Sequence, residues 1–167
     1  MEDNITAIPE SQVPPHNPVS DTNQIDIRYM TLALQEANKA LQEGEIPVGC
    51  IIVSDGHIVG KGHNLTQTLQ DVTAHAEMQA ITAAADFLGG KYLDVCTLYV
   101  TLEPCDMCAG AIALSQISRI VFGVSDPKRG FSRHPDAHII HQKVIIEKNV
   151  LSDECSTLLK DFFAKKR

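Results

Sequence analysis

Two short motifs constrain the fold of this chain more than any other feature of its sequence. The first is His-Ala-Glu at residues 75–77, and the second is Pro-Cys-Asp-Met-Cys at residues 104–108. Histidine and cysteine are the side chains that bind zinc most often in proteins, and two cysteines three positions apart on a helix share one face. We therefore expect a fold that brings both motifs to one metal ion.

The spacing within each motif predicts that the amino-terminal ends of two helices converge on this ion. Inside a helix, His75 and Glu77 would point to nearly opposite sides, because they are two positions apart. At the beginning of a helix, His75 can bind the metal while Glu77 reaches a water on it. Cys105 and Cys108 fall in a first helical turn, where unpaired N–H groups and the helix dipole stabilise thiolates.

One histidine and two cysteines are the ligand set of a catalytic zinc site, since structural zinc usually has four protein ligands. Zinc lowers the pKa of a bound water toward neutrality, and a carboxylate such as Glu77 can move its proton. Two alternatives stay open: Cys-x-x-Cys could be a redox pair, or a fourth ligand could complete a structural site. The candidates for that ligand are Cys50, Cys96, Cys155 and His63. His134, His138 and His141 are better explained as solvated loop residues than as a second metal cluster.

The hydrophobic pattern predicts the element order α-β-β-α-β-α-β-β-α. Helices are expected over 26–43, over 75–88, from Pro104 to about Leu114, and from a cap at Ser152 to about Lys166. Apolar and β-branched runs predict strands over 48–53, 57–62, 97–102, 117–122 and 143–147. This order is typical of an α/β fold in three α/β/α layers, with one mixed sheet of about five strands and helices on both faces.

Length and charge limit the organisation of the chain. Its 167 residues suit a single domain, expected over 25–167, whereas the proline-rich segment 1–24 is expected to be a disordered tail. No apolar run reaches the ~18 residues of a membrane span, and five cysteines without a disulfide framework favour the cytoplasm. The net charge of −7 argues against a protein whose whole surface binds nucleic acid. Two groups of basic residues could still form local nucleic-acid-binding patches, or they could be solvated side chains on exposed faces. These patches are Arg119, Lys128, Arg129 and Arg133, and Lys160, Lys165, Lys166 and Arg167.

The paired motifs resemble the signature of the cytidine and deoxycytidylate deaminase superfamily, in which zinc activates a water and a glutamate moves protons. A closer resemblance is to the bacterial tRNA-specific adenosine deaminases, which make inosine at the wobble position of the anticodon. It covers nearly everything after Asp26, although the loop 131–142, FSRHPDAHIIHQ, departs from the family pattern. The similar stretches are IPVG at 46–49, GKGHN ending at Asn64, TAHAE at 73–77, TLYVTLEPCDMCAGA at 97–111, VFGVSDPKRG at 121–130 and LSDECSTLLKDFFAKKR at 151–167.

This resemblance implies roles for individual residues. His75, Cys105 and Cys108 would hold one zinc ion per subunit, and Glu77 would shuttle protons. Asn64, the backbone of Ala76 and the side chain of Val48 would form the base pocket. Asp126 would contact the ribose, and Phe162 with the last basic residues would support the anticodon loop. Each substrate contact has a purely structural alternative: Asn64 as a turn cap, and Val48 and Phe162 as core residues.

The resemblance also implies a cytidine-deaminase-like fold and a homodimer in which both subunits build each RNA site. The expected partner is a tRNA anticodon stem-loop, with no role for a membrane. The main alternative is a deaminase of a free base or nucleoside of the cytosine, guanine or adenine type. A zinc-stabilised RNA-binding subunit without catalysis is a third hypothesis, against which Glu77 argues, because a structural site needs no such carboxylate.

Overall fold

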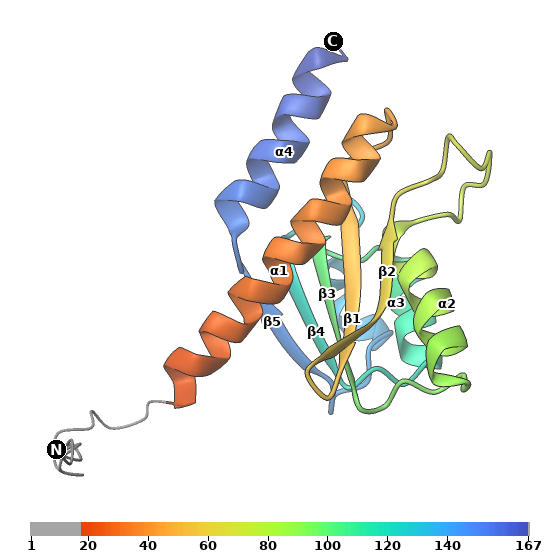
Figure 1. Ribbon diagram of the computed structural model, residues 1–167, viewed down its shortest axis with the longest axis vertical. Coiled ribbons are helices and arrows are strands. Elements are labelled where there is room, and N and C mark those ends of the chain that lie inside the picture. The colour runs from red at the N-terminus through yellow and green to blue at the C-terminus, as the bar shows by residue number, and fades with distance from the viewer. Residues whose placement is uncertain (1–17, 167) are drawn as a thin grey trace, which may run out of the picture.

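A mixed sheet forms the centre of the protein, whose residues 18–166 are described by a computed structural model (Figure 1). Within this part of the chain the strands are β1 (Gly49–Ser54), β2 (His57–His63), β3 (Cys96–Leu102), β4 (Arg119–Val124) and β5 (Ile145–Lys148), in the spatial order β2-β1-β3-β4-β5. Strand β1 is antiparallel to β2 and β3, whereas β4 is parallel to both β3 and β5. The predicted mixed sheet is confirmed.

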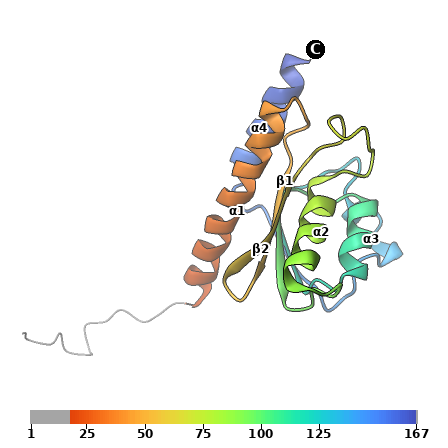
Figure 2. The same cartoon turned by 45° about the vertical axis from the view of Figure 1, so that its right-hand side comes forward.

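Helices cover both faces of this sheet, which gives the three predicted layers. Helices α1 (Pro18–Gln42) and α4 (Ser152–Lys165) lie on one face, and α2 (Ala76–Leu88) and α3 (Asp106–Leu114) lie on the other (Figures 1 and 2). Consecutive strand residues point to opposite faces, so Ile51 packs with α1 and α4 while Ile52 packs with α2 and α3. Among these described helices, none is long and apolar enough to span a membrane.

Glycines let two helices approach the sheet closely. A Cβ atom at Gly49 would overlap the carbonyl oxygen of Ala33 in α1, and one at Gly62 would overlap the carbonyl oxygen of Ala76 in α2. The first turn of α2 therefore lies directly on the end of β2, which fixes the place of the His-Ala-Glu motif relative to the sheet.

Helix α1 is longer than its sequence pattern predicts. It begins at Pro18 rather than Asp26, so residues 18–24, which we assigned to the tail, are helical. The prediction rested on an amphipathic repeat, which cannot indicate the preceding turns because they carry no such repeat. The remainder of the predicted tail, 1–17, lies outside the described residues.

Strand β5, expected over 143–147, also begins two residues late, at Ile145, and three further boundaries differ for an identifiable local reason. Helix α3 begins at Asp106, not at Pro104, because Pro104 and Cys105 pair with the loop after β4 before the helix starts. Strand β4 begins two residues after the expected Ile117, whose N–H still bonds to the last turn of α3. Ser152 is the first residue of α4 and makes no cap, since the chain turns at Leu151 in a left-handed conformation (φ 52°).

Candidate metal centre and substrate groove

The amino-terminal ends of α2 and α3 converge at one point, as the two motifs predict. His75 is the residue directly before α2 and Cys105 the residue directly before α3, and both have an extended backbone. The Nδ1 atom of His75 lies 3.7 Å from Sγ of Cys105 and 3.5 Å from Sγ of Cys108. Three potential ligands from two helices therefore surround one position.

These distances fit a zinc ion. Bonds of about 2.3 Å to sulfur and about 2.0 Å to nitrogen, at a tetrahedral angle, separate the nitrogen from each sulfur by about 3.6 Å. The three ligand atoms lie within 4.8 Å of one another, and no fourth His, Cys, Asp or Glu of the described chain joins them. Neither the structural site with a fourth ligand nor the second histidine cluster is therefore found in this part of the chain. The group is suited to one zinc ion per subunit, with three protein ligands.

The charges of the three side chains also suit a cation. The pKa of Cys105 is lowered to about 4, mainly because Cys108 donates a hydrogen bond to its sulfur and His75 lies beside it. The same hydrogen bond and burial raise the pKa of Cys108. The hydrogen bond with Cys105 raises the pKa of His75. The group thus holds protons that a metal ion must displace, which is how thiolate sites bind metals.

Glu77 lies in the first turn of α2 and lines the same cavity as His75 and Cys105. Its burial raises the pKa of its carboxyl to about 7. A carboxyl with a pKa near neutrality can both accept and donate a proton at physiological pH. Glu77 therefore has the position and the acidity that proton transfer at this site requires.

A groove of about 870 Å³ leads from the metal ligands to α4. Three of the residues predicted to bind substrate, Val48, Asn64 and Asp126, line this groove. Ala76 does not line it with its side chain, since it is the fully buried first residue of α2. Val48, Asn64 and Asp126 thus share one groove with His75 and Cys105.

Phe162, which was predicted to support the anticodon loop, is not in the groove. Its ring is 6% exposed and packs against the core, with Nζ of Lys166 4.6 Å from its centroid. The adjacent Phe163 is 48% exposed and lines the groove instead. Neighbouring helix residues point in different directions, so the choice between the two depends on how α4 is rotated against the sheet.

The predicted basic stretch 119–133 divides among three places. Arg119, the first residue of β4, binds Asp26 of α1 at 2.7 Å, and Arg133 binds Asp106 of α3 at 2.7 Å. The other two cations of this stretch, Lys128 and Arg129, line the groove from the loop after β4, and Lys160 and Lys166 of the second predicted patch line it from α4. Because the lining also contains Glu77, Glu103 and Asp126, its cations and acidic groups nearly balance, and the groove is less acidic than the chain as a whole, which carries a net charge of −7.

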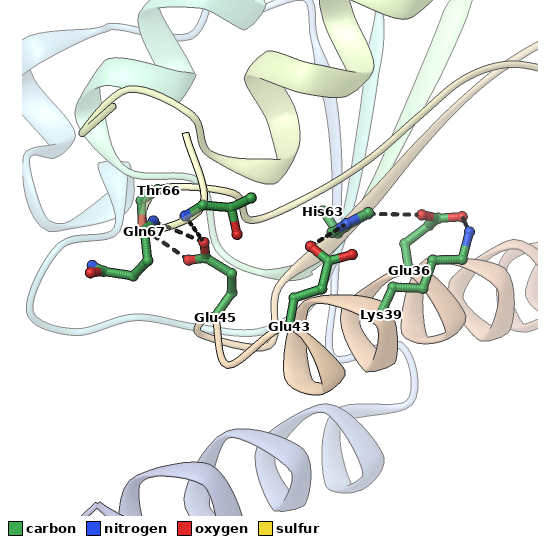
Figure 3. Close-up of polar contacts among 8 residues, drawn as sticks. Glu36, Lys39, Glu43, Glu45, His63, Thr66 and Gln67 are labelled. Carbon is green, nitrogen blue, oxygen red and sulfur yellow. Dashed lines mark hydrogen bonds and ion pairs between the residues drawn. The ribbon is translucent and has the colours of Figure 1, made fainter. Parts of the chain in front are cut away.

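The residues on both sides of Asn64 are held by carboxylates of α1 and of the segment that follows it (Figure 3). Glu45, 1% exposed, accepts hydrogen bonds from the backbone N–H of Gln67 at 2.8 Å and of Thr68 at 2.7 Å. On the other side of Asn64, the ring of His63 lies between two carboxylates (Figure 3). One belongs to Glu36 of α1 and the other to Glu43, in the turn after α1.

The sequence analysis did not identify Glu45 as a functional residue. The only available signal was an acidic residue next to an apolar strand. Glu103, which follows the end of β3, is a second acidic residue of this kind and accepts hydrogen bonds from the backbone N–H groups of Asp126 and Ser132. A buried carboxylate is costly unless it is hydrogen-bonded, so acidic residues next to buried strands are candidates for holding a loop.

Known proteins share this fold and these motifs. A family model described as the cytidine and deoxycytidylate deaminase zinc-binding region matches residues 23–124. A tRNA-specific adenosine deaminase of Bacillus subtilis (strain 168) is 44% identical over 147 residues, which are 85% of this chain and 91% of that protein. Its counterpart in Aquifex aeolicus (strain VF5) is 45% identical over 143 residues, 83% of this chain and 94% of its own. A solved structure from a study of A-to-I editing by tRNA deaminases at the wobble position matches with a TM-score of 0.74 and 38% identity, over 79% of this chain and 99% of its own.

Proposed function

This chain belongs to the cytidine and deoxycytidylate deaminase family, and we propose that it converts adenosine to inosine at the wobble position of tRNA. The observation that carries the proposal is the three-ligand group of His75, Cys105 and Cys108 beside the carboxyl of Glu77, at the end of a groove to which four cations contribute. The similarity to tRNA-specific adenosine deaminases over most of the chain supports the choice of substrate.

The chemistry needs a nucleophile and a proton carrier. Zinc, when bound by the three ligands, supplies a water of lowered pKa. Glu77 accepts a proton from this water as the oxygen bonds to C6 of the adenine, and passes it to ring nitrogen N1. Glu77 then takes the proton of the hydroxyl group now on C6 and delivers it to the amino group; the bond between C6 and that nitrogen breaks, a carbonyl group is left at C6, and ammonia leaves. Adenosine and water are thereby converted to inosine and ammonia.

Base recognition falls to residues around the ligands. Among the described residues, none makes a hydrogen bond with the side-chain amide of Asn64, so we assign this amide to the edge of the purine. Val48 forms an apolar wall of the base pocket, and the backbone of Ala76 completes it. One carboxylate oxygen of Asp126 accepts the N–H groups of Lys128 and Arg129, and we assign the other to the ribose.

The anticodon stem-loop is the proposed partner in the groove, where Phe163, Lys160 and Lys166 replace Phe162 as its support from α4. A base in such a loop is partly unstacked, which lowers the cost of moving it into the pocket. We place this activity in one domain, which comprises the predicted residues 25–167 together with the helical residues 18–24. The five cysteines, which form no disulfide with one another, support the cytoplasm as its location.

We further propose that the protein is a homodimer in which both subunits contribute to each RNA site. Met107 and Leu114 lie on one side of α3, seven positions apart, and are 37% and 81% exposed. A second copy of the chain would remove these apolar side chains from water.

The test is incubation of the purified, zinc-loaded protein with the organism's own tRNA, followed by nucleoside analysis. We expect inosine in tRNA, no comparable turnover of free adenine, cytosine, guanine or their nucleosides, and a rate that falls steeply with salt. Equal turnover of tRNA and a free base, unaffected by salt, would instead identify the protein as a deaminase of free bases or nucleosides.

A further inference from the structure

Glu103 is a buried carboxylate that accepts hydrogen bonds from backbone N–H groups of one loop. Its side chain lies at the end of β3, two residues before Cys105, and the residue is 3% exposed. Oε2 accepts the N–H of Asp126 at 2.9 Å, and Oε1 accepts the N–H of Ser132 at 3.0 Å. No lysine, arginine or histidine of the described chain forms an ion pair with it, so these two hydrogen bonds are its main compensation for burial.

The loop of residues 125–133 closes around this carboxylate. Gly130 packs against it so closely that a Cβ atom there would overlap the carboxyl group of Glu103. The N–H of Gly130 bonds to the carbonyl of Asp126 at 2.8 Å, and the N–H of Phe131 bonds to the carbonyl of Pro104 at 3.0 Å. Glu103 thus joins the beginning and the end of the loop and ties both to the segment that carries Cys105.

The same loop forms one wall of the groove. Asp126, Lys128 and Arg129 line it next to the metal ligands. Glu103 also lines the groove, but it is 3% exposed and both of its oxygens accept hydrogen bonds from the loop, so we expect it to influence a substrate mainly through the groups that the loop presents. A shift of the loop would move the carboxylate of Asp126 and two cations together.

We propose that Glu103 is a positioning residue, which holds the loop 125–133 in register with the metal centre and thereby sets the affinity for the RNA substrate. The proposal rests on the proposed function for the identity of the substrate, but the attachment of the loop to Glu103 can be measured without any substrate.

The test is the variant Glu103→Gln, which keeps the shape of the side chain and turns an acceptor oxygen into an amide that faces a backbone N–H. We expect full zinc content, faster hydrogen exchange in 125–133, and a KM for tRNA raised about tenfold with kcat changed by no more than about twofold. The matched control is Asp26→Asn, which neutralises an equally buried carboxylate at the Arg119 pair, outside the groove. This control should lower stability but leave KM and the exchange of 125–133 unchanged.

A double-mutant cycle distinguishes positioning from a general loss of stability. If Glu103 acts through Asp126, then Asp126→Ala in the Glu103→Gln background should raise KM by no more than about a further twofold, less than it does alone. The proposal would be overturned if the effects of the two substitutions on KM multiplied in the double variant. It would also be overturned if Glu103→Gln changed neither KM nor the hydrogen exchange of 125–133.

Should Glu103→Gln fail to fold, Glu103→Asp decides, because the shorter side chain keeps the charge but cannot reach the N–H groups of both Asp126 and Ser132. Wild-type KM and loop exchange in that variant would count against the proposal. An inactive wild-type protein would refute the proposed function alone, since the exchange measurements still report whether Glu103 holds the loop.

Discussion

The Nδ1 atom of His75 lies 3.5 Å from the Sγ atom of Cys108, although the two residues belong to the first turns of different helices. Both helices point their amino-terminal ends at this position, so backbone N–H groups and helix dipoles favour the negative charge of thiolates there. The sheet sets the distance between the two motifs. The motif His-Ala-Glu follows β2 and the loop after it, and the motif Pro-Cys-Asp-Met-Cys follows β3. The centre is therefore built by the fold and completed by three side chains.

Loss of one ligand should abolish metal binding. We expect Cys108→Ala to lose zinc and inosine formation together, since two remaining ligands hold the ion weakly. Metal analysis of the purified variant and nucleoside analysis of treated tRNA check this. The control is Cys155→Ala, which removes a buried thiol of α4 on the face of the sheet opposite to α2 and α3 and should retain zinc. Full zinc content in Cys108→Ala would contradict the assignment.

Replacement of Glu77 should separate chemistry from metal binding. In Glu77→Gln the amide cannot carry protons, so we expect kcat to fall by about a thousandfold while zinc content and thermal stability stay near wild type. Single-turnover measurement of inosine at saturating enzyme gives this rate directly. Wild-type turnover with zinc bound would refute the proton-shuttle role.

The groove cations should govern the salt dependence of tRNA binding. We expect Lys160→Ala and Lys166→Ala each to raise KM and to reduce the slope of log KM against log salt by about 0.7–1, as loss of one phosphate contact does. Kinetics at several salt concentrations provide the slopes. Lys61→Ala, an exposed cation on β2 outside the groove, should change neither quantity. Equal effects from all three substitutions would mean that the groove has no special role.

The two neighbouring phenylalanines of α4 should respond differently to truncation. Phe162→Ala removes a core side chain, so we expect a loss of about 3 kcal/mol in the free energy of unfolding. Phe163→Ala should cost about 1 kcal/mol or less but raise the KM for tRNA, because its half-exposed ring lines the groove. Urea denaturation and tRNA kinetics on both variants test the pair, and the reverse pattern would return the RNA contact to Phe162.

Glu45 should make stability depend on pH. Burial raises the pKa of its carboxyl, but hydrogen bonds from Thr68, Gln67 and Thr66 outweigh this and lower it below the ordinary value. A carboxyl with a lowered folded pKa stabilises the protein above its unfolded pKa of about 4.3, and this contribution is lost as pH falls through the folded pKa. We expect Glu45→Gln to have a smaller free energy of unfolding than wild type at pH 7, and urea titrations should show this difference narrowing below about pH 4. A difference in the free energy of unfolding that does not change with pH would exclude this contribution.

The sequence by itself determined the element order, the three metal ligands and the neighbouring carboxyl of Glu77. These features follow local rules: hydrophobic periodicity distinguishes helices from strands, and the spacing within His-Ala-Glu and Pro-Cys-Asp-Met-Cys reflects the start of a helix. Boundaries that local rules do not control, such as the start of α1 at Pro18, were placed wrongly.

Only the tertiary structure decided which side chains share a surface. It separated Arg119 from Lys128 and Arg129, placed Phe163 rather than Phe162 in the groove, and surrounded Glu103 with N–H groups from a loop far along the chain. Helix rotation, loop closure and the partners of a buried charge depend on how distant segments pack, and no pattern within a short stretch of residues contains that information.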